Sequence, residues 1–454
     1  MSHTQPTLSG SLESSVEPTP VPWLFVVFRA ESPMTPSSRH LLTGLDAVAI
    51  GRADRTSWER SSARLSIGLD DARASSTHAR LERVVHQWVL EDLGSRNGTL
   101  VNGLPVRRVV LANGDLIEMG HSFLRYRELA PASESRPDVV ADPDATSPGL
   151  VTLVPTFAHA LARLRLVAAS PESILIMGES GTGKELIARA VHTLSRRPGV
   201  LVPVNCGALP ESMVEAELFG HKRGSFSGAS ADRTGLMRAA DRGTLFLDEI
   251  GDLRLTSQTV LLRALQEQQV TPVGGERPVD LDLRLVCATH RTLDRCVADG
   301  AFREDLLARI RGFVLHLPAL RERREDLGIL VAAILDRLAG AQASQVRFSG
   351  RAARALLGHA WPQNVRELEK ALGAALALAN GGPIRHEHLP DTVREVKAVP
   401  PTESDAAMDR ERLVELLRAH QGNITAVARA CGKARTQVQR WLQRFDVDAS
   451  EFRS

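Results

Sequence analysis

Apolar and polar positions follow three different rhythms along the 454-residue chain. Between residues 22 and 129, short apolar runs at 24–28, 47–50, 87–91 and 123–127 alternate with turns rich in Gly, Asn, Asp and Ser. Short strands spaced in this way, with no helix-period segment between them, are typical of a β-sandwich. No hydrolytic set of side chains occurs there, so the sequence predicts a β-sandwich that serves as a binding module.

The second rhythm, between residues 150 and 392, alternates helix-period and strand-like segments, which predicts an α/β domain with a parallel sheet. An apolar run at 174–177 leads into the sequence GESGTGKE at 178–185 and then into a helical pattern. Strand, glycine-rich turn, lysine and helix form the setting of a phosphate-binding loop, because backbone N–H groups there point at negative charge. The predicted phosphate-binding residues are Gly178, Glu179, Ser180, Gly181, Thr182, Gly183, Lys184 and Glu185.

A second motif completes this predicted nucleotide site. The run GTLFLDE at 243–249 has the pattern of a buried strand that ends in two acids, at the sheet edge where open α/β sheets bind ligands. Lys184 would reach the β- and γ-phosphates as a point charge. Asp248 would hold Mg²⁺, and Glu249 would orient and activate the attacking water. Together the two motifs predict hydrolysis of a nucleoside triphosphate.

The third rhythm is helical and occupies residues 407–447. Apolar residues recur at helical spacing before Gly432 and again after it, which predicts a helix, a short turn and a helix. Residues 423–444 contain five basic side chains and no acid, the local charge expected of a DNA-binding element. A three-helix dimerisation bundle is the alternative interpretation.

Polar segments separate these parts. Residues 1–21 have the composition of a disordered N-terminus, and residues 130–149 and 393–406 have that of linkers.

The four cysteines are scattered, so neither a disulfide framework nor a zinc site is indicated. A net charge of +2 restricts any nucleic-acid role to a local region. With no secretory signal and no long apolar run, we expect a soluble cytoplasmic protein with no membrane partner.

The loops of the N-terminal part carry a specific set of motifs. Gly51-Arg52 closes one strand, SSTH lies at 75–78, and GSRNGT at 94–99 precedes VNG at 101–103. Together they resemble the forkhead-associated domain, a β-sandwich that binds phosphothreonine peptides through loops at one end. The resemblance implies that Arg52, Ser75 and Arg96 contact phosphate or its neighbours and that Asn97 holds the peptide backbone, a donor set that suits a phosphate dianion. The alternative is a sandwich kept only for contacts with the rest of the chain.

Six stretches of the central part form a second series. They are VNCGALP at 204–210, ELFGHKRGSFSGA at 217–229, RLVCATH at 284–290, FREDLLAR at 302–309, LPALRERRED at 317–326 and WPQNVREL at 361–368. With the two nucleotide motifs, they are similar to bacterial enhancer-binding proteins, the AAA+ ATPases that activate RNA polymerase carrying sigma-54. The resemblance covers residues 150–390 almost continuously, and it implies ATP as the nucleotide, with Mg²⁺.

This resemblance also implies roles outside the two nucleotide motifs. Asn205 would switch the orientation of Glu249, and Thr289 with His290 would sense the γ-phosphate from the next strand. His290 stands where the family usually has Asn. Arg366 would sense nucleotide from a helical lid domain.

Two arginines are implied to act between subunits. Arg303 and Arg309 would serve as arginine fingers on a neighbour's γ-phosphate, which implies a ring, usually a hexamer. Solvated helix charge is the alternative for both side chains.

The loop at 224–229 reads GSFSGA where the family has GAFTGA. Phe226 and both glycines are kept, so the apolar tip that would engage sigma-54 remains. The residues implied to contact sigma-54 are Gly224, Ser225, Phe226, Ser227, Gly228 and Ala229.

The C-terminal part resembles the Fis-type helix-turn-helix domain that ends enhancer-binding proteins. Such domains usually dimerise, so a palindromic upstream DNA site is expected. The residues implied to face the major groove or its phosphates are Arg435, Thr436, Gln437, Gln439 and Arg440.

Together these resemblances predict a three-part transcription activator. A phosphothreonine reader would sense a Ser/Thr-kinase signal, an AAA+ ring would hydrolyse ATP to remodel sigma-54 polymerase, and a helix-turn-helix would hold upstream DNA. The alternative, motivated by the loop substitutions, is a DNA-bound, phosphoprotein-responsive repressor or scaffold whose ATPase does not act on sigma-54.

Overall fold

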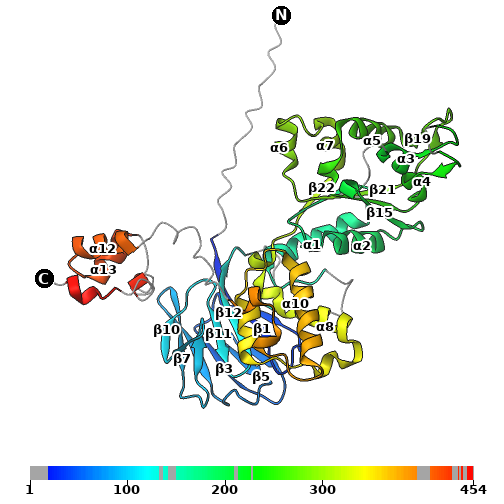
Figure 1. Ribbon diagram of the computed structural model, residues 1–454. Coiled ribbons are helices and arrows are strands. Elements are labelled where there is room, and N and C mark those ends of the chain that lie inside the picture. Colours follow the sequence, from blue (N-terminus) through cyan, green and yellow to red (C-terminus); the bar gives the residue numbers. More distant parts are fainter. Residues whose placement is uncertain are drawn as a thin grey trace, which may run out of the picture.

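The computed structural model describes residues 19–131, 136–141, 150–208, 213–225, 229–395, 410–431, 438, 441–442 and 447–452. These residues form a β-sandwich, an α/β domain, a helical lid and a small C-terminal group of helices (Figure 1). The predicted β-sandwich and the predicted α/β domain with a parallel sheet are therefore confirmed.

Two mostly antiparallel sheets make up the sandwich. The seven-stranded sheet runs in the order β13 (Asp138–Val140), β2 (Ser38–Leu41), β1 (Val21–Arg29), β12 (Ser122–Leu129), β11 (Leu116–Met119), β8 (Thr99–Val101), β9 (Leu104–Val106). The six-stranded sheet runs β10 (Arg108–Val110), β7 (Gln87–Asp92), β6 (Ala79–Val84), β3 (Ala47–Arg52), β5 (Arg64–Leu69), β4 (Ser57–Arg60).

Strand β1 is apolar on both of its faces. Leu24 and Val26 point into the sandwich and pack with the six-stranded sheet. Trp23, Phe25 and Val27 alternate with them and point outward, yet each is completely buried. A sheet with one solvated face would carry polar residues at those positions, so another part of the chain must cover β1.

The predicted linker at 130–149 is wrong at residues 138–140, which form strand β13 beside β2. Asp138 holds this strand in place, because its carboxylate accepts hydrogen bonds from Arg60 Nε (2.5 Å) and His40 Nδ1 (2.7 Å). Both partners are distant in sequence, so local composition gives no sign of the strand.

The α/β domain contains a five-stranded parallel sheet. Its strands are ordered β15 (Leu201–Asn205), β18 (Thr244–Asp248), β21 (Arg284–Thr289), β14 (Ile174–Met177), β22 (Phe313–His316). The helices are α1 (Pro155–Ala168), α2 (Lys184–Ser195), α3 (Val214–Phe219), α4 (Leu236–Ala239), α5 (Leu255–Glu267), α6 (Leu293–Ala298) and α7 (Glu304–Ile310).

Each face of this sheet has its own hydrophobic core. Ile174 and Ile176 of β14 pack with α1 and α2, whereas Leu175 between them faces the core formed with α3, α5 and α7. Strands buried on both faces need continuous apolar runs, which is the pattern of residues 174–177 and 245–247. The sheet therefore fixes the loops at the carboxyl ends of its strands rigidly.

The lid follows β22 and is mainly helical. Its elements are η3 (Leu320–Glu322), η4 (Arg324–Asp326), α8 (Leu327–Ala339), η5 (Gly340–Gln345), α9 (Gly350–Gly358), α10 (Asn364–Ala379), η6 (His386–His388) and α11 (Asp391–Arg394). The predicted domain end at residue 392 falls inside α11, and Val393 is buried in the lid core, so that boundary is corrected to lie beyond α11. Among the described residues, one helical stretch, 324–345, is long and apolar enough to span a membrane. Its apolar residues are explained by the contact that α8 makes with the sandwich.

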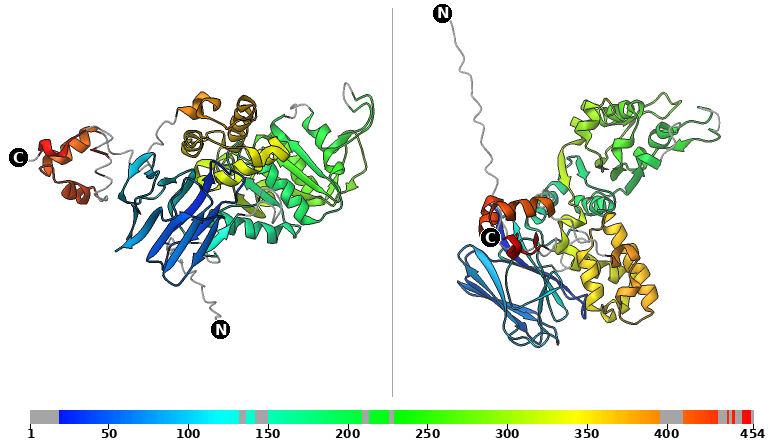
Figure 2. Two further views of the ribbon diagram at one scale, coloured as in Figure 1. Left: turned by 90° about the horizontal axis from the view of Figure 1, so that it is seen from below. Right: turned by 60° about the vertical axis from the view of Figure 1, so that its left-hand side comes forward.

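The sandwich and the lid share one hydrophobic core. The outward face of β1 meets α8 and the helices behind it, and the lid lies against the sandwich in each view of Figures 1 and 2. Gly328 of α8 lies so close to β1 that a Cβ there would approach the carbonyl oxygen of Val27 to 1.9 Å. The Phe28 and Phe348 rings pack edge to face with centroids 5.4 Å apart. The covering element that β1 requires is thus the lid.

Polar contacts fix the orientation of the sandwich on the lid. Arg354 of α9 forms a two-pronged ion pair with Glu118 of β11, with N–O distances of 2.7–2.9 Å. Glu325 of η4 is completely buried and lies 3.1 Å from Arg127 of β12. A buried carboxylate needs a paired charge, so this contact also depends on close packing of the two parts.

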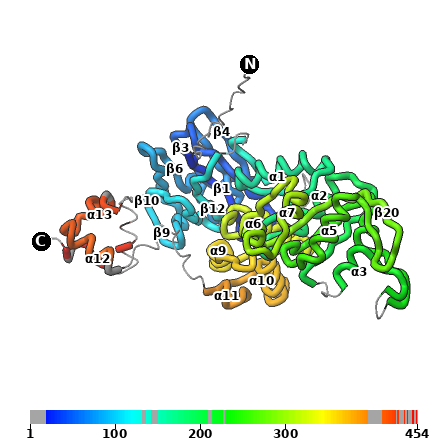
Figure 3. Tube along the Cα trace, turned by 90° about the horizontal axis from the view of Figure 1, so that it is seen from above, coloured from blue at the N-terminus to red at the C-terminus, as the bar shows by residue number. Residues whose placement is uncertain are grey.

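The C-terminal helices, coloured orange to red in Figure 3, form a separate small core. Helices α12 (Arg410–Ala419) and α13 (Ile424–Ala430) are joined by a turn in which Gln421 and Gly422 have positive φ. Asn423 immediately precedes α13 and caps it, because its side-chain oxygen accepts the backbone N–H groups of residues 425 and 426. The helix-turn-helix as a whole stays a prediction, because most of residues 432–446 lie outside the described chain.

Candidate nucleotide site and partner-binding surfaces

The glycine-rich loop connects β14 to α2 at the carboxyl edge of the parallel sheet. Gly181 (φ 77°) and Gly183 (φ 103°) adopt the left-handed conformation that glycine tolerates best. A Cβ on Gly181 would lie 2.3 Å from the carbonyl oxygen of Gln363, so this glycine also lets the lid approach the loop. The first N–H groups of α2 have no partners within the helix, which makes the loop a ready site for phosphate.

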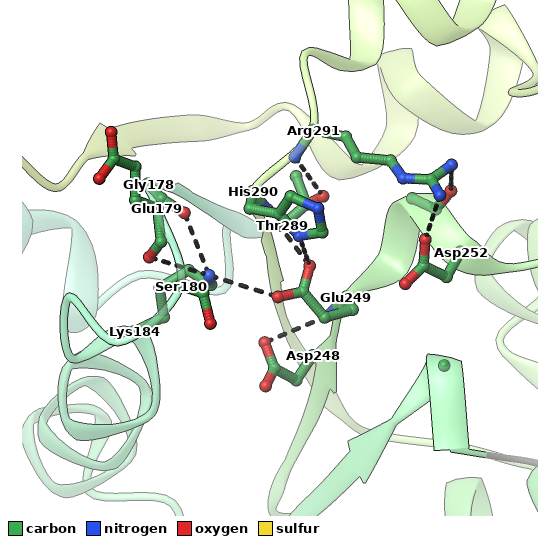
Figure 4. Close-up of polar contacts among 12 residues, drawn as sticks. Gly178, Glu179, Ser180, Lys184, Asp248, Glu249, Asp252, Thr289, His290 and Arg291 are labelled. Atoms are coloured by element: carbon green, nitrogen blue, oxygen red, sulfur yellow. Dashed lines mark hydrogen bonds and ion pairs between the residues drawn. The ribbon is translucent and has the colours of Figure 1, made fainter. Parts of the chain in front are cut away.

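Lys184 is the first residue of α2, and its ammonium group lies within the loop. It is 7% exposed, and Nζ donates to the carbonyl oxygens of Gly178 (3.1 Å) and Glu179 (3.4 Å). The same Nζ lies 3.4 Å from Oε1 of Glu249 (Figure 4). The structure therefore brings the predicted lysine and the predicted catalytic acid together.

Two adjacent acids end strand β18, and their environments differ. Burial, and then the charge of Glu249, raise the pKa of Asp248. Burial acts to raise the pKa of Glu249 as well, but a hydrogen bond from His290 and the charge of Lys184 outweigh it and lower that pKa. Glu249 is thus held ionised, as a proton acceptor must be.

A cation would relieve the charge repulsion at Asp248. In nucleotide sites Mg²⁺ is usually bound by one or two carboxylates, with water and substrate phosphates completing the shell. Asp248 fits this arrangement, because it lies half-buried at the strand end facing the phosphate loop. Across the described chain, no group of three or more His, Cys, Asp or Glu side chains gathers around one point. Water and phosphate oxygens would complete the shell of an ion held by Asp248.

Strands β15 and β21 flank β18 and bring three more predicted residues to the same edge. Thr289 ends β21, is completely buried, and accepts the backbone N–H of Arg291. His290 Nδ1 lies 2.6 Å from Glu249 Oε2. The Asn205 side-chain oxygen instead accepts backbone N–H groups of the turn η1 (Cys206–Ala208), at 3.0 and 3.2 Å. Among the described residues, Glu249 is therefore held by His290 and Lys184 and not by Asn205.

The lid closes over the phosphate loop. Arg366 Nη1 donates to the Ser180 hydroxyl at 3.1 Å, so the predicted nucleotide sensor does reach the loop. The N–H of Val365 donates to the carbonyl oxygen of Gly181 at 2.9 Å. These contacts place the start of α10 directly against the phosphate loop.

Sequence reasoning missed two residues that join lid and loop. Asn364 Nδ2 donates to Glu179 Oε2 (3.1 Å) and to the carbonyl oxygen of Ser180 (3.0 Å). Arg321 forms a two-pronged pair with Glu179 at 2.5 and 2.8 Å, and this hydrogen bonding lowers the pKa of Glu179 to about 2. Asn364 lies in the motif at 361–368, and Arg321 lies in the motif at 317–326. The motifs therefore contained both residues, but nothing in the sequence indicated that either contacts Glu179.

The two predicted arginine fingers lie away from this phosphate loop. The Arg303 guanidinium pairs with Asp305 at the start of α7. The backbone oxygen of Arg309 accepts from Ser173, which precedes β14, so Arg309 sits at the amino edge of the sheet, opposite the phosphate loop. Arg309 also lines a cavity of about 420 Å³ there. Within the described chain neither arginine contacts Lys184, and the predicted action of both on a neighbouring subunit stays a prediction.

The predicted sigma-54 loop joins two short strands, β16 (Gly220–His221) and β17 (Arg233–Thr234). The N–H of Gly224 donates to the carbonyl oxygen of Ala229 at 2.9 Å, which closes the base of the loop. Lys222 pairs with Asp232 at 2.6 Å across the same base. Phe226, Ser227 and Gly228 lie outside the described residues.

The four predicted phosphopeptide residues lie together at one end of the sandwich. The N–H of Arg52 donates to the carbonyl oxygen of Ser75 (2.8 Å), and the N–H of Arg96 donates to the Ser75 hydroxyl (3.0 Å). Asn97 Nδ2 donates to the carbonyl oxygen of Arg73 at 2.7 Å. Buried His78 accepts the Ser75 N–H at Nδ1, which fixes the loop's shape. The Arg52 and Arg96 side chains remain exposed beside these loops.

The predicted DNA-contacting residues, Arg435, Thr436, Gln437, Gln439 and Arg440, all lie outside the described part of the chain. Their roles therefore stay predictions.

Comparisons with known proteins agree with this architecture. Residues 150–316 match the sigma-54 interaction domain, residues 321–406 the AAA+ ATPase lid domain, and residues 48–120 the FHA domain. These matches, together with the nucleotide site, define an AAA+ ATPase.

Similar proteins then identify the family. The chain is 42% identical over 308 residues to transcriptional regulatory protein GlrR of Escherichia coli K12. The aligned region covers 67% of this chain and 69% of GlrR. It is 40% identical over 299 residues to regulatory protein AtoC of the same organism, covering 63% and 65% of the two chains. A crystal structure of NtrX from Brucella abortus in complex with ADP superposes with a TM-score of 0.51 at 32% identity, covering 64% of this chain and 68% of that one. The chain belongs to the family of sigma-54-dependent transcriptional regulators.

Proposed function

We propose that this protein is a cytoplasmic activator of sigma-54 RNA polymerase, which hydrolyses ATP to remodel the polymerase closed complex. The observation that carries the proposal is the closed nucleotide site. Phosphate loop, strand-end acids and lid meet around one space, and the hairpin β16–β17 of the same domain carries the GSFSGA loop.

Each residue of the nucleotide site would have a separate role in ATP hydrolysis. When bound, Mg²⁺ would neutralise phosphate charge, and Asp248 would hold it. Lys184 has to exchange its contact with Glu249 for the β- and γ-phosphates, because the ammonium lies between the acid and the loop. Glu249 then has an oxygen available to take a proton from the attacking water. Arg303 and Arg309, which lie away from their own loop, would serve a neighbouring subunit in a ring.

Regulation would enter through the sandwich. Arg52, Ser75, Arg96 and Asn97 would bind a phosphothreonine segment of a protein in a Ser/Thr-kinase pathway. The shared core of sandwich and lid supports this role, because the phosphopeptide loops then belong to the same packed body that touches the phosphate loop. The C-terminal helices would bind a palindromic upstream site as a dimer.

Transcription in vitro tests the central proposal. Full-length protein is needed, since removal of the sandwich would uncover the lid face that β1 buries. The wild type should give ATP-dependent transcripts from sigma-54 polymerase already held in a closed complex. Phe226→Ala should abolish transcripts yet keep ATP hydrolysis, because Phe226 belongs to neither of the two nucleotide motifs. Lys184→Ala should lose both activities and serves as the matched control.

Two results would count against the proposal. If wild-type protein hydrolyses ATP without producing transcripts, the DNA-bound repressor or scaffold becomes the better description. If Phe226→Ala activates as well as wild type, the loop at 224–229 does not deliver the work of hydrolysis to sigma-54.

A further inference from the structure

Three buried charged residues connect the sandwich, the lid and the phosphate loop. They are Arg39 of β2, Asp326 at the end of η4, and Arg323, which directly precedes η4. Burial lowers the pKa of both guanidinium groups, and in each case the charge of Asp326 acts in the opposite direction. The two arginines therefore share one buried carboxylate, and displacement of one of them changes the electrostatic surroundings of the other.

On the sandwich side, the contact passes through the segment that precedes α1. The Arg39 guanidinium lies 5.4 Å from the centre of the Trp23 ring, and its Nη1 donates to the carbonyl oxygen of Leu153 at 2.8 Å. The N–H of Leu153 donates to Asp326 Oδ1 at 2.7 Å, and the Thr152 hydroxyl donates to Oδ2 at 2.7 Å. This segment is thus held between an arginine of the sandwich and a carboxylate of the lid.

On the nucleotide side, Arg323 contacts the phosphate loop itself. Its Nη2 donates to the carbonyl oxygen of Thr182 at 2.9 Å, and its guanidinium lies 5.4 Å from the centre of the Phe157 ring in α1. The peptide bond between Thr182 and Gly183 is planar, so its C=O and N–H groups point in opposite directions. Holding the carbonyl therefore also orients the N–H of Gly183, one of the predicted phosphate-binding residues.

A side chain from outside the ATPase domain is thus part of the support of the nucleotide site. We propose that Arg39 is a positioning residue of the phosphate loop, so that full affinity for nucleotide requires the sandwich to be docked. Without Arg39, the buried carbonyl of Leu153 loses its donor, and the segment that orients Asp326 is free to move. The inference concerns nucleotide binding alone and does not depend on recognition of phosphothreonine.

Variants of Arg39 test this role in the full-length protein. Arg39→Gln should raise the Kd for ADP, measured by calorimetry, and the KM for ATP by at least ~5-fold each. Its kcat should change less than about twofold, because the lost interaction supports binding and not the chemical step. Arg39→Lys keeps a donor and a charge and should recover part of the affinity. Arg354→Gln is the matched control, since it removes the ion pair with Glu118 that also joins sandwich and lid, and it should leave both constants unchanged.

A double-mutant cycle separates transmission through Asp326 from general loosening of the domain contact. If both arginines act through this carboxylate, Arg39→Gln combined with Arg323→Gln should weaken ADP binding at least ~3-fold less than the product of the two single effects. Independent, multiplying effects would overturn the inference. Wild-type ADP affinity in Arg39→Gln, or an equal loss of affinity in Arg354→Gln, would overturn it as well.

A variant within the segment provides the test if Arg39→Gln does not fold. Thr152→Val removes one hydrogen bond to Asp326 at nearly constant volume and leaves the Arg39 contact in place. It should raise the Kd for ADP at least ~2-fold. An unchanged Kd in a folded Thr152→Val protein would show that Asp326 does not connect the segment to the phosphate loop.

Discussion

At the scale of single residues, Asp138 shows how one carboxylate can determine whether a segment is a linker or a strand. Its side chain is 13% exposed and contacts Arg60 and His40 from two other strands. Burial acts to raise the pKa of Asp138, but the hydrogen bonds from Arg60 and His40 outweigh it and lower the pKa to about 2. A folded-state pKa below the ordinary 3.8 means that the ionised form stabilises the fold.

Replacing this carboxylate should release strand β13. Asp138→Asn is expected to lower hydrogen-exchange protection of residues 138–140 by ~5–30-fold at pH 7, equivalent to about 1–2 kcal/mol of local opening free energy. The stabilisation is fully present above pH 3.8 and is lost as pH falls through about 2, so the difference should shrink in acid. Asp46→Asn, which removes an exposed pair with Arg83, is the control and should have little effect. Equal losses in the two variants would contradict this account.

At the scale of elements, the contact of α8 with β1 depends on a glycine. A Cβ on Gly328 would lie 1.9 Å from the Val27 carbonyl oxygen and 2.5 Å from the Ser37 hydroxyl. A backbone atom in a central strand cannot move away without breaking the ladder between β1 and its neighbours. The helix would have to withdraw from the sandwich instead.

Gly328→Ala should therefore lower the thermal midpoint of the sandwich–lid unit by several degrees. Overpacking of this kind costs about 1–3 kcal/mol, more than the ~1 kcal/mol that Ala gains over Gly in a helix. Gly373→Ala in α10 is the matched control, since its Cβ would meet Leu338 at an ordinary 3.8 Å. The control should be unchanged or more stable. A Gly328→Ala protein as stable as the control would show that α8 and β1 are not tightly packed.

Local patterns predicted the elements well and their mutual packing poorly. The phosphate loop and the strand-end acids follow from short-range chemistry, so Lys184 and Glu249 were placed beside each other correctly. The contact of Arg321 and Asn364 with Glu179 depends on closure of the lid, which no local spacing encodes. The apolar run at 24–28 predicted a strand, but nothing in it indicated that both faces of this strand are buried or that the lid covers one of them.

At the scale of the whole molecule, sandwich and lid behave as one packed unit that touches both candidate ligand sites. At one end Asn97 donates to the loop containing Asp71, which in turn accepts the N–H of His121 at 2.7 Å. Ala30 donates to the His121 carbonyl oxygen (2.8 Å) and accepts from the N–H of Phe348 in the lid (2.7 Å). At the other end residues 364–366 of the lid donate hydrogen bonds to the phosphate loop. Rearrangement at either site must be accommodated by the same body.

Phosphopeptide and nucleotide binding should consequently be linked. A phosphothreonine peptide is expected to change the Kd for ATP by at least ~5-fold, and ATP should change the Kd for the peptide by the same factor, because coupling between two ligands is reciprocal. Titrations of full-length protein by calorimetry measure both factors. Arg52→Ala should lose peptide binding and leave the Kd for ATP unchanged. Peptide binding without any change in ATP affinity would rule out the linkage.

The discontinuous core also has a consequence for biosynthesis. The outward face of β1 is translated near the start of the chain, but its cover lies in residues 320–393, after the entire α/β domain. Roughly 180 residues separate the end of the sandwich from the lid, so at ~5–20 residues per second the ribosome needs about 10–35 s to supply the cover. During that interval the sandwich can already be folded, but its outward face exposes the apolar side chains of Trp23, Phe25 and Val27 to solvent. Newly made chains therefore depend on chaperone protection or on rapid arrival of their own lid.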